Sequence, residues 1–240
     1  WPTLPEMFEI TAERFPDRNC LTVFEAERIT LTYRETLAAI RKLAGWLVAH
    51  GVKKGSHVAV SGKNSSEWAI VYLSVLYAGG TIIPIDYGLH DYEIASLLKT
   101  AKPLFFFVDE EQYDYFFVRA TGQPFMGKIY SLSPRHADRY VYNLDAPPLE
   151  TYIPLKENDT AAILFTSGTM GNPKGVMLTH KNLVSDCYIA QTRMKLYPTD
   201  VFYALLPIHH AYTMLAVFIE ALSVGAEVVF AQSMAAQKML

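Results

Sequence analysis

The chain has 240 residues, of which 51% are hydrophobic and 19% are charged, and its formal net charge is -3 at pH 7. This length and hydrophobic content allow a large buried core in one or two lobes. The absence of a basic excess argues against nucleic-acid binding. The two cysteines, Cys20 and Cys187, match no metal-ligand spacing. We therefore expect two reduced thiols in a cytoplasmic protein.

The N-terminal region alternates between helix-like and strand-like patterns. Apolar residues at helical spacing predict a short amphipathic helix within residues 1–20. Two strands, at 20–24 and 29–31, are expected to pair around a charged turn. Thr32 and Glu35 have the spacing of a capping box, which predicts that the next helix begins there.

The alternation continues after that helix. Asn64, with Glu67 three residues later, is expected to cap a helix that runs to about Tyr77. The other expected elements are strands at 57–60, 81–85 and 104–108 and a helix at 91–100. Strands joined by helices imply crossover connections, so this region predicts an α/β fold with a mostly parallel sheet.

One uncharged run, residues 68–85, approaches the length of a membrane-spanning helix. It contains Gly79-Gly80, and the β-branched residues that follow stand before Pro84. A buried helix, a glycine turn and a buried strand explain this composition better than one long helix. We therefore predict no transmembrane segment.

The second half of the chain begins with a less regular stretch. Residues 109–158 mix aromatic residues with prolines, and Pro147-Pro148 indicates a connector. Beyond it we expect strands at 161–165, 176–178, 201–206 and 227–230, a helix capped by Thr179, and an apolar helix that ends near Leu222. We divide the chain into a first α/β lobe, residues 1–150, and a second lobe, residues 151–240.

The loop between the first two strands of the second lobe reads Thr-Ser-Gly-Thr-Met-Gly-Asn-Pro-Lys-Gly, residues 166–175. Glycines let backbone N–H groups converge on an anion, and hydroxyls add further donors. Lys174 supplies a compact positive charge that suits a phosphate. The common phosphate loop requires Ser or Thr after the lysine and leads into a helix, whereas here Gly175 follows and a second strand is expected. A surface turn is the simpler interpretation of such loops, but the full pattern favours polyphosphate binding.

This stretch resembles the signature Thr-Ser-Gly-Thr-Thr-Gly-x-Pro-Lys-Gly of the adenylate-forming, or AMP-binding, superfamily. That superfamily includes acyl- and aryl-CoA synthetases, peptide-synthetase adenylation domains and beetle luciferases. The resemblance extends over essentially the whole chain and departs from the signature at Met170, where a hydroxyl residue is usual. It implies the N-terminal part of the adenylate-forming fold, with mostly parallel sheets flanked by helices.

The chain also indicates a truncated protein. It begins at Trp1 without a methionine, and its last residues favour a helix without a stop signal. Three features of the family are missing: the glutamate that shares Mg2+, the aspartate that binds the ribose, and the C-terminal domain with its catalytic lysine. We therefore expect the remainder of the N-terminal domain and the whole C-terminal domain to be absent and this chain alone to be inactive.

The resemblance implies an ATP-dependent acid–thiol ligase. In the family reaction a carboxylate attacks the α-phosphate of ATP, pyrophosphate leaves, and coenzyme A captures the acyl-adenylate. No protein nucleophile is needed, because positioning and charge stabilisation carry most of the catalysis. By resemblance, Thr166 supplies a hydroxyl to Mg2+ and Lys174 is the lysine of the motif. The positions that wrap the β- and γ-phosphates are Ser167, Gly168, Thr169 and Gly171.

A second constellation is His209-His210. Adjacent histidines that end a strand face opposite ways, which predicts a poor metal pair. Leu-Pro-Ile-His-His, residues 206–210, resembles the family segment in which an aromatic residue and a histidine follow a Leu-Pro turn. By this resemblance His210 orients the acyl substrate, and the next helix lines or backs its pocket through Tyr212, Met214, Leu215 and Phe218. The last two also fit an ordinary core. Asp86, at the end of a predicted strand, is expected to serve a turn and not catalysis.

Together these observations favour the N-terminal portion of an acyl-CoA synthetase that acts on a fatty acid. An aryl-CoA ligase or an amino-acid adenylation domain remains open. The alternative of another class is an inactive nucleotide-binding interaction module, which Met170 favours. A third alternative is a plain α/β domain in which the glycine loop is only a turn. The expected ligands are ATP, Mg2+, a small carboxylic acid and coenzyme A, the last bound mostly outside this chain. A lipid substrate would suit peripheral contact with a membrane.

Overall fold

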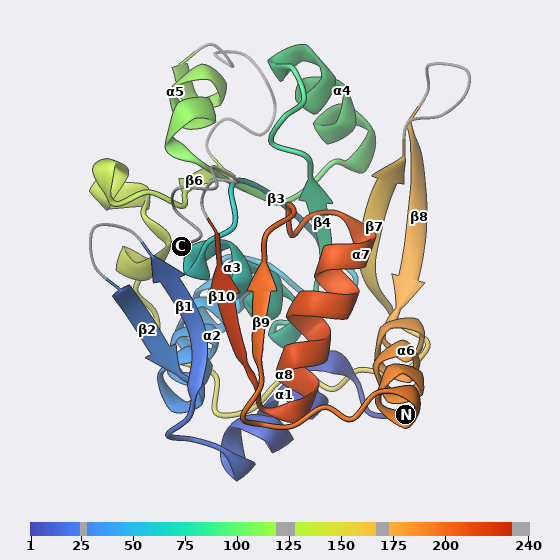
Figure 1. Cartoon of the computed structure of the whole chain (residues 1–240). Coiled ribbons are helices and arrows are strands. Elements are labelled where there is room, and N and C mark those ends of the chain that lie inside the picture. Colours follow the sequence, from blue (N-terminus) through green and yellow to red (C-terminus); the bar gives the residue numbers. More distant parts are fainter. Residues whose placement is uncertain (25–27, 119–127, 167–172, 232–240) are drawn as a thin grey trace.

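The computed structural model describes residues 1–24, 28–118, 128–166 and 173–231. These residues form two β-sheets with helices between and around them (Figure 1). One sheet has four strands in the order β2-β1-β10-β9, and the other has six in the order β6-β5-β3-β4-β7-β8. The pairs β1–β2 and β7–β8 are antiparallel, and all other pairs are parallel. The predicted α/β class with mostly parallel sheets is confirmed.

The strands of the four-stranded sheet are β1 (Asn19–Phe24), β2 (Arg28–Thr32), β9 (Val201–Ala204) and β10 (Glu227–Phe230). Those of the six-stranded sheet are β3 (His57–Ser61), β4 (Thr81–Ile85), β5 (Phe105–Val108), β6 (Ile129–Ser131), β7 (Thr160–Thr166) and β8 (Lys174–Thr179). The α-helices are α1 (Leu4–Arg14), α2 (Tyr33–Ala49), α3 (Ser66–Tyr77), α4 (Asp91–Ala101), α5 (Glu110–Val118), α6 (His180–Arg193), α7 (Ala211–Thr213) and α8 (Glu220–Val224). Between the last two lies a π-helical segment, η4 (Met214–Ile219), and two 3-10 segments are η2 (Pro134–Arg139) and η3 (Val141–Asn143).

The start of α2 is set by local sequence, as predicted. The backbone N–H of Glu35 donates to the Thr32 hydroxyl at 3.2 Å, and the Thr32 N–H donates to the Glu35 carboxylate at 2.8 Å. These two bonds satisfy two of the N–H groups that a helix leaves free at its start.

The predicted cap of α3 is wrong. Ser65 caps this helix, since its hydroxyl accepts from the N–H of Trp68 at 3.1 Å. Asn64 lies one residue earlier, and its carboxamide bonds to the distant chain segment that follows β9. The physical reason is that a buried amide is satisfied by whichever partners the tertiary structure brings to it, and a serine next to it can supply the cap.

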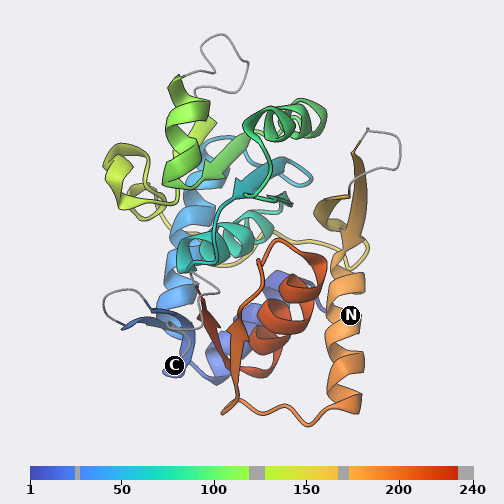
Figure 2. The ribbon, with the colours of Figure 1, turned by 45° about the horizontal axis from the view of Figure 1, so that its top comes forward.

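The interior lies between the two sheets, where α3 contacts β1 on one side and β3 and β4 on the other (Figure 2). Every residue of α3 except Glu67 is buried. This explains the uncharged run 68–85, which forms a helix covered on all sides and then the central strand β4. Among the described residues, no helix is long and apolar enough to cross a membrane.

Both sheets combine strands from before and after residue 150. The four-stranded sheet joins β1 and β2 to β9 and β10, and the six-stranded sheet adds β7 and β8 beside β4. The two predicted lobes therefore share both sheets, and the boundary at residue 150 stays a prediction. The helix α5 was not predicted, because its aromatic and acidic residues show no clear helical stripe.

Candidate functional site

The glycine-rich loop joins two antiparallel strands, β7 and β8, at the outer edge of the six-stranded sheet (Figure 1). The last pair of this hairpin is Thr166 and Lys174, and the Thr166 hydroxyl donates to the Lys174 carbonyl at 3.5 Å. Both residues are exposed. The predicted strand-to-strand path of the loop is confirmed. Ser167, Gly168, Thr169 and Gly171 lie outside the described residues, as does Met170.

Gly175 fits the hairpin because a larger residue has little room there. A Cβ at this position would lie 2.9 Å from Cγ2 of Ile163 and 3.5 Å from the ring of Phe165. Phe165 is also its cross-strand partner. The aromatic ring thus occupies the space beside a residue that has no side chain of its own.

His209 and His210 lie in the turn that follows β9. The strand ends at Ala204, and the N–H of His210 donates to the carbonyl of Pro207 at 3.2 Å. The centroids of the two imidazole rings are 4.2 Å apart. The prediction that they face opposite ways is therefore wrong, because strand alternation does not apply to a turn.

Asp86 joins this pair from the end of β4. Its Oδ1 lies 3.2 Å from Nε2 of His209 and accepts from the N–H of Gly88 at 2.8 Å. The bond from Gly88 is the turn role that was predicted for Asp86. The contact with His209 was not expected, and it brings a carboxylate to a histidine that is only 7% exposed. One ligand atom from each of Asp86, His209 and His210 lies within 4.8 Å of the others.

Burial sets the charge state of His209. Loss of hydration lowers the pKa of this imidazole, the Asp86 carboxylate raises it, and His210 lowers it again. Desolvation is the largest of these effects, so His209 is a neutral base at neutral pH.

Asn64 fixes the loop that carries the histidines. Its amide nitrogen donates to the carbonyls of Ala204 at 2.8 Å and Leu206 at 2.9 Å, and its oxygen accepts from the N–H of Ile208 at 2.8 Å. Asn64 follows β3, so the six-stranded sheet holds the loop of the four-stranded sheet in place. Sequence reasoning missed this role. The available signal was a polar residue shortly after a buried strand, which in α/β sheets is where ligand-binding segments lie.

The hairpin and the histidine loop meet the same edge of the six-stranded sheet. Ile82 of β4 pairs with Ala162 of the parallel strand β7. Four residues further along each strand come Asp86 and Thr166, both at the carboxyl end of their strands. In open α/β sheets this edge is where ligands bind.

The helical segment after His210 contributes more to the core than to an open surface. The Phe218 ring packs against Trp68 and Tyr72, with centroids 6.2 and 5.6 Å away, and Met214 is also buried. Leu215 is half-buried, whereas Tyr212 is 71% exposed. Of the four residues expected near the acyl pocket, Phe218 therefore has the core surroundings that the sequence also allowed.

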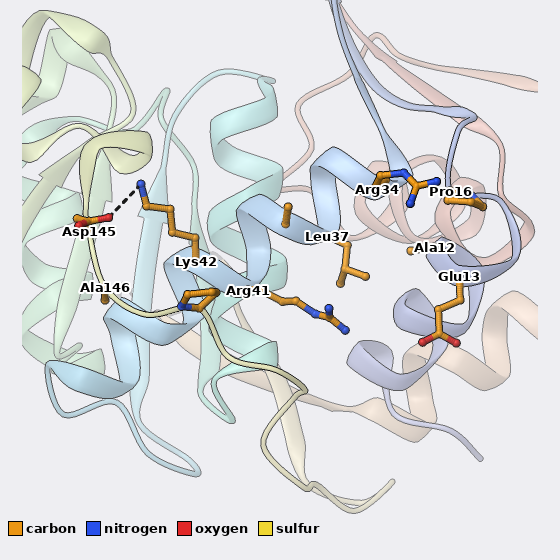
Figure 3. A pocket seen from close by; sticks show the side chains of 11 residues that line it. Ala12, Glu13, Pro16, Arg34, Leu37, Arg41, Lys42, Asp145 and Ala146 are labelled. Atoms are coloured by element: carbon orange, nitrogen blue, oxygen red, sulfur yellow. Dashed lines mark ion pairs between the residues drawn. The ribbon is translucent and has the colours of Figure 1, made fainter.

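A separate pocket lies elsewhere, between α1, α2 and the segment at 145–148 (Figure 3). Its volume is about 710 Å3, and none of its lining residues comes from β7, β8 or the loop after β9. Each of its cations has a carboxylate partner: Arg34 pairs with Asp17, Arg41 with Glu9 and Lys42 with Asp145. With these charges already neutralised, the pocket is a poor anion site.

The model of the family described as AMP-binding enzyme matches residues 8–240. The chain belongs to the AMP-binding family. It is 28% identical to a medium-chain fatty-acid–CoA ligase of Escherichia coli K12 over 87% of this chain and 38% of that protein. It is 33% identical to tyrocidine synthase 1 of Brevibacillus parabrevis over 76% of this chain and 16% of that protein.

The fold is that of the adenylate-forming enzymes. The crystal structure of ATP-bound MatB from Rhodopseudomonas palustris superimposes with a TM-score of 0.84 at 24% identity, over 99% of this chain and 47% of that one. The chain thus spans less than half the length of each of these three proteins. The resemblance of the loop to the adenylate-forming signature is confirmed at the level of the family.

Proposed function

We propose that this chain is the N-terminal part of an AMP-forming ligase that activates a carboxylic acid, namely a fatty acid, and transfers it to coenzyme A. One observation carries the proposal. The hairpin residues of the family signature and the loop with His210 meet the same carboxyl edge of one sheet. Membership of the AMP-binding family and similarity to a fatty-acid–CoA ligase support it.

The phosphate end of the site is assigned to the hairpin. Lys174 is exposed, and no carboxylate among the described residues pairs with it, so its ammonium group is available to a phosphate. The signature residues Ser167, Gly168, Thr169 and Gly171 would surround the β- and γ-phosphates.

Thr166 suits a role beside Mg2+, because a hydroxyl oxygen is a hard ligand and its one bond in this hairpin, to the Lys174 carbonyl, is long. One protein oxygen is enough where phosphates and water complete the shell. When bound, Mg2+ would neutralise charge on the phosphates of ATP.

The acid end is assigned to His210. Its side chain is exposed next to the buried His209, on a loop that Asn64 holds rigid. An imidazole carried on a backbone held in this way can hold the substrate carboxylate in line with the α-phosphate. The carboxylate itself is the nucleophile, so the role of His210 is to orient it.

The further assignments follow from the same proposal. This chain alone would not turn over, since the relatives it matches are more than twice as long. We place the protein in the cytoplasm, with both free cysteines buried. A lipid substrate would bring it into peripheral contact with a membrane, and the net charge of -3 gives no basis for nucleic-acid binding. We also propose that the chain divides into lobes at 1–150 and 151–240.

The test is pyrophosphate release by the full-length enzyme with fatty, aromatic and amino acids. Lys174→Ala is expected to raise the KM for ATP, and His210→Ala to raise the KM for the acid or lower kcat, each by about tenfold or more. Lys181→Ala is the matched control. Lys181 follows β8 at the end of the hairpin away from the loop, and its ammonium group pairs with Glu157. Equal kinetics of all three variants would refute the assignments.

A second candidate is an amino-acid adenylation domain, which the 33% identity to tyrocidine synthase 1 favours. Release of pyrophosphate only with amino acids would establish it and would exclude the fatty-acid assignment. Retained ATP binding without release for any acid would instead support an inactive nucleotide-binding module.

A further inference from the structure

One carboxylate and two imidazoles converge between the end of one sheet strand and the turn after another. Asp86 comes from the end of β4, and His209 and His210 come from the turn after β9. One ligand atom of each lies within 4.8 Å of the other two. The closest approach, between Oδ1 of Asp86 and Nε2 of His209, is 3.2 Å.

His209 is the unusual member of this cluster. It is 7% exposed, and neither of its ring nitrogens makes a hydrogen bond of normal geometry to any described residue. Its Nε2 lies 3.2 Å from Oδ1 of Asp86, and no hydrogen bond of normal geometry joins the two atoms. Buried polar atoms in native proteins normally have a partner, so a buried nitrogen that lies beside a carboxylate without bonding to it points to a third group that binds both.

We propose that Asp86, His209 and His210 form a binding site for a divalent transition cation of the zinc type. Tetrahedral Zn2+ with bonds of about 2.0–2.1 Å places its ligand atoms roughly 3.3 Å apart. The Asp86–His209 pair already has this spacing. His210 is exposed, so a side-chain rotation can bring its nitrogen to the same point. The fourth position stays open to water or to a carboxylate.

The donor set decides the class of cation. Two imidazoles and one carboxylate suit zinc and its neighbours, whereas Mg2+ and Ca2+ prefer oxygen ligands alone. The ligands are also held from behind, since the Gly88 N–H bonds to Oδ1 of Asp86 and Asn64 holds the backbone of the histidine loop. Such supporting bonds strengthen metal sites, because they reduce the reorganisation that binding requires.

The consequence for the reaction rests on the proposed function. A cation bound to His210 would withdraw this imidazole from the substrate carboxylate. Zinc would then inhibit acyl-adenylate formation competitively with the acid and not with Mg-ATP. This site is distinct from the Mg2+ position assigned to Thr166, which uses a hydroxyl on another strand.

Binding is measured on the purified chain without ATP or acid, so the result does not depend on the ligase function. Zinc chloride is titrated calorimetrically in a buffer that does not bind metals, and Co2+ binding is followed by its visible absorption. We expect one equivalent of each metal and the intense visible band of a four-coordinate Co2+ site. Asp86→Asn and His210→Ala should each weaken binding by about 10–100-fold.

His90→Ala is the matched control, since His90 is an exposed histidine of the segment between β4 and α4 that lies outside the cluster. Asp86 and His210 are not fully buried, and circular dichroism of each variant checks that it remains folded. Unchanged zinc affinity in both cluster variants, or an equal loss in His90→Ala, would overturn the proposal. Absence of any zinc binding by the folded parent chain would do so as well.

Discussion

The two ends of the candidate site are built in opposite ways. The histidine loop has a buried centre, Ile208 and His209, and is fixed by three side-chain bonds from Asn64, which is 5% exposed. The end of the β7–β8 hairpin is exposed, and β8 is the outermost strand of its sheet (Figure 2). Thr166 and Lys174 are joined there by one side-chain bond of 3.5 Å. In the proposed function, the acid end would therefore be shaped before substrate arrives, whereas Thr166 and Lys174 at the phosphate end would be free to adjust to a ligand.

The largest effect is expected at the buried end, from Asn64→Ala. This change leaves two carbonyls and one N–H without their side-chain partner, and two of the three lost bonds are buried. We expect a loss of about 3–4 kcal/mol in the free energy of unfolding. The measurement is urea denaturation, in which the midpoint should fall while the m-value stays the same.

Asn143→Ala is the matched control for this change, because Asn143 is exposed and donates one bond, to the Ala137 carbonyl at 3.0 Å. Its expected cost is at most about 1 kcal/mol. Similar losses for the two asparagines would mean that the histidine loop is not held more tightly than the surface.

The next effect is a pH dependence at the base of the hairpin. His180 follows β8 directly, is fully buried, and accepts the N–H of Leu4 at its Nδ1, 3.2 Å away. Burial lowers the pKa of His180 from 6.5 to about 4. Because the folded state holds this imidazole neutral, its stabilising contribution is complete above pH 6.5 and is lost as the pH falls towards 4.

Between pH 7.5 and 4.5 this loss should reach about 2–3 kcal/mol of unfolding free energy. His180→Gln keeps an acceptor for Leu4 but does not titrate, so its stability should decline less over the same interval. The difference between the two pH profiles, obtained from denaturant unfolding, isolates the histidine. If the stability of the parent chain and of His180→Gln fell equally with pH, His180 would be open to water, as Thr166 and Lys174 are at the other end of the hairpin.

A smaller effect is expected within the hairpin, from Gly175→Ala. The new methyl group would lie 2.9 Å from Cγ2 of Ile163, so one strand must shift slightly. We expect a loss of about 0.5–1 kcal/mol, visible as a lower Tm. In an Ile163→Ala background the same change should cost less, because the opposing carbon is gone. An equal cost in both backgrounds would place the strain elsewhere.

The difference between the two ends also explains what the sequence could predict. The hairpin and the Thr32 cap depend on neighbours within about ten residues, and both were predicted correctly. The role of Asn64 depends on carbonyls 140 and 142 residues away, which no local pattern contains. The direction of His209 was missed because β9 ends at Ala204, before the expected boundary at 206. A shift of two residues turned a strand pair into a turn and removed the alternation on which that prediction rested.

The smallest change in stability is expected at the phosphate end, from Lys174→Ala. Lys174 is exposed, and among the described residues its ammonium group has no carboxylate partner, so truncation should change the free energy of unfolding by less than about 0.5 kcal/mol. Thr166→Val should behave alike, since its one bond is long. Urea denaturation of each variant beside Asn64→Ala provides the measurement. A loss above about 1 kcal/mol in either would mean that these groups already hold the fold together. Groups with that structural task would not be free to rearrange around a polyphosphate, and the contrast between the two ends would fail.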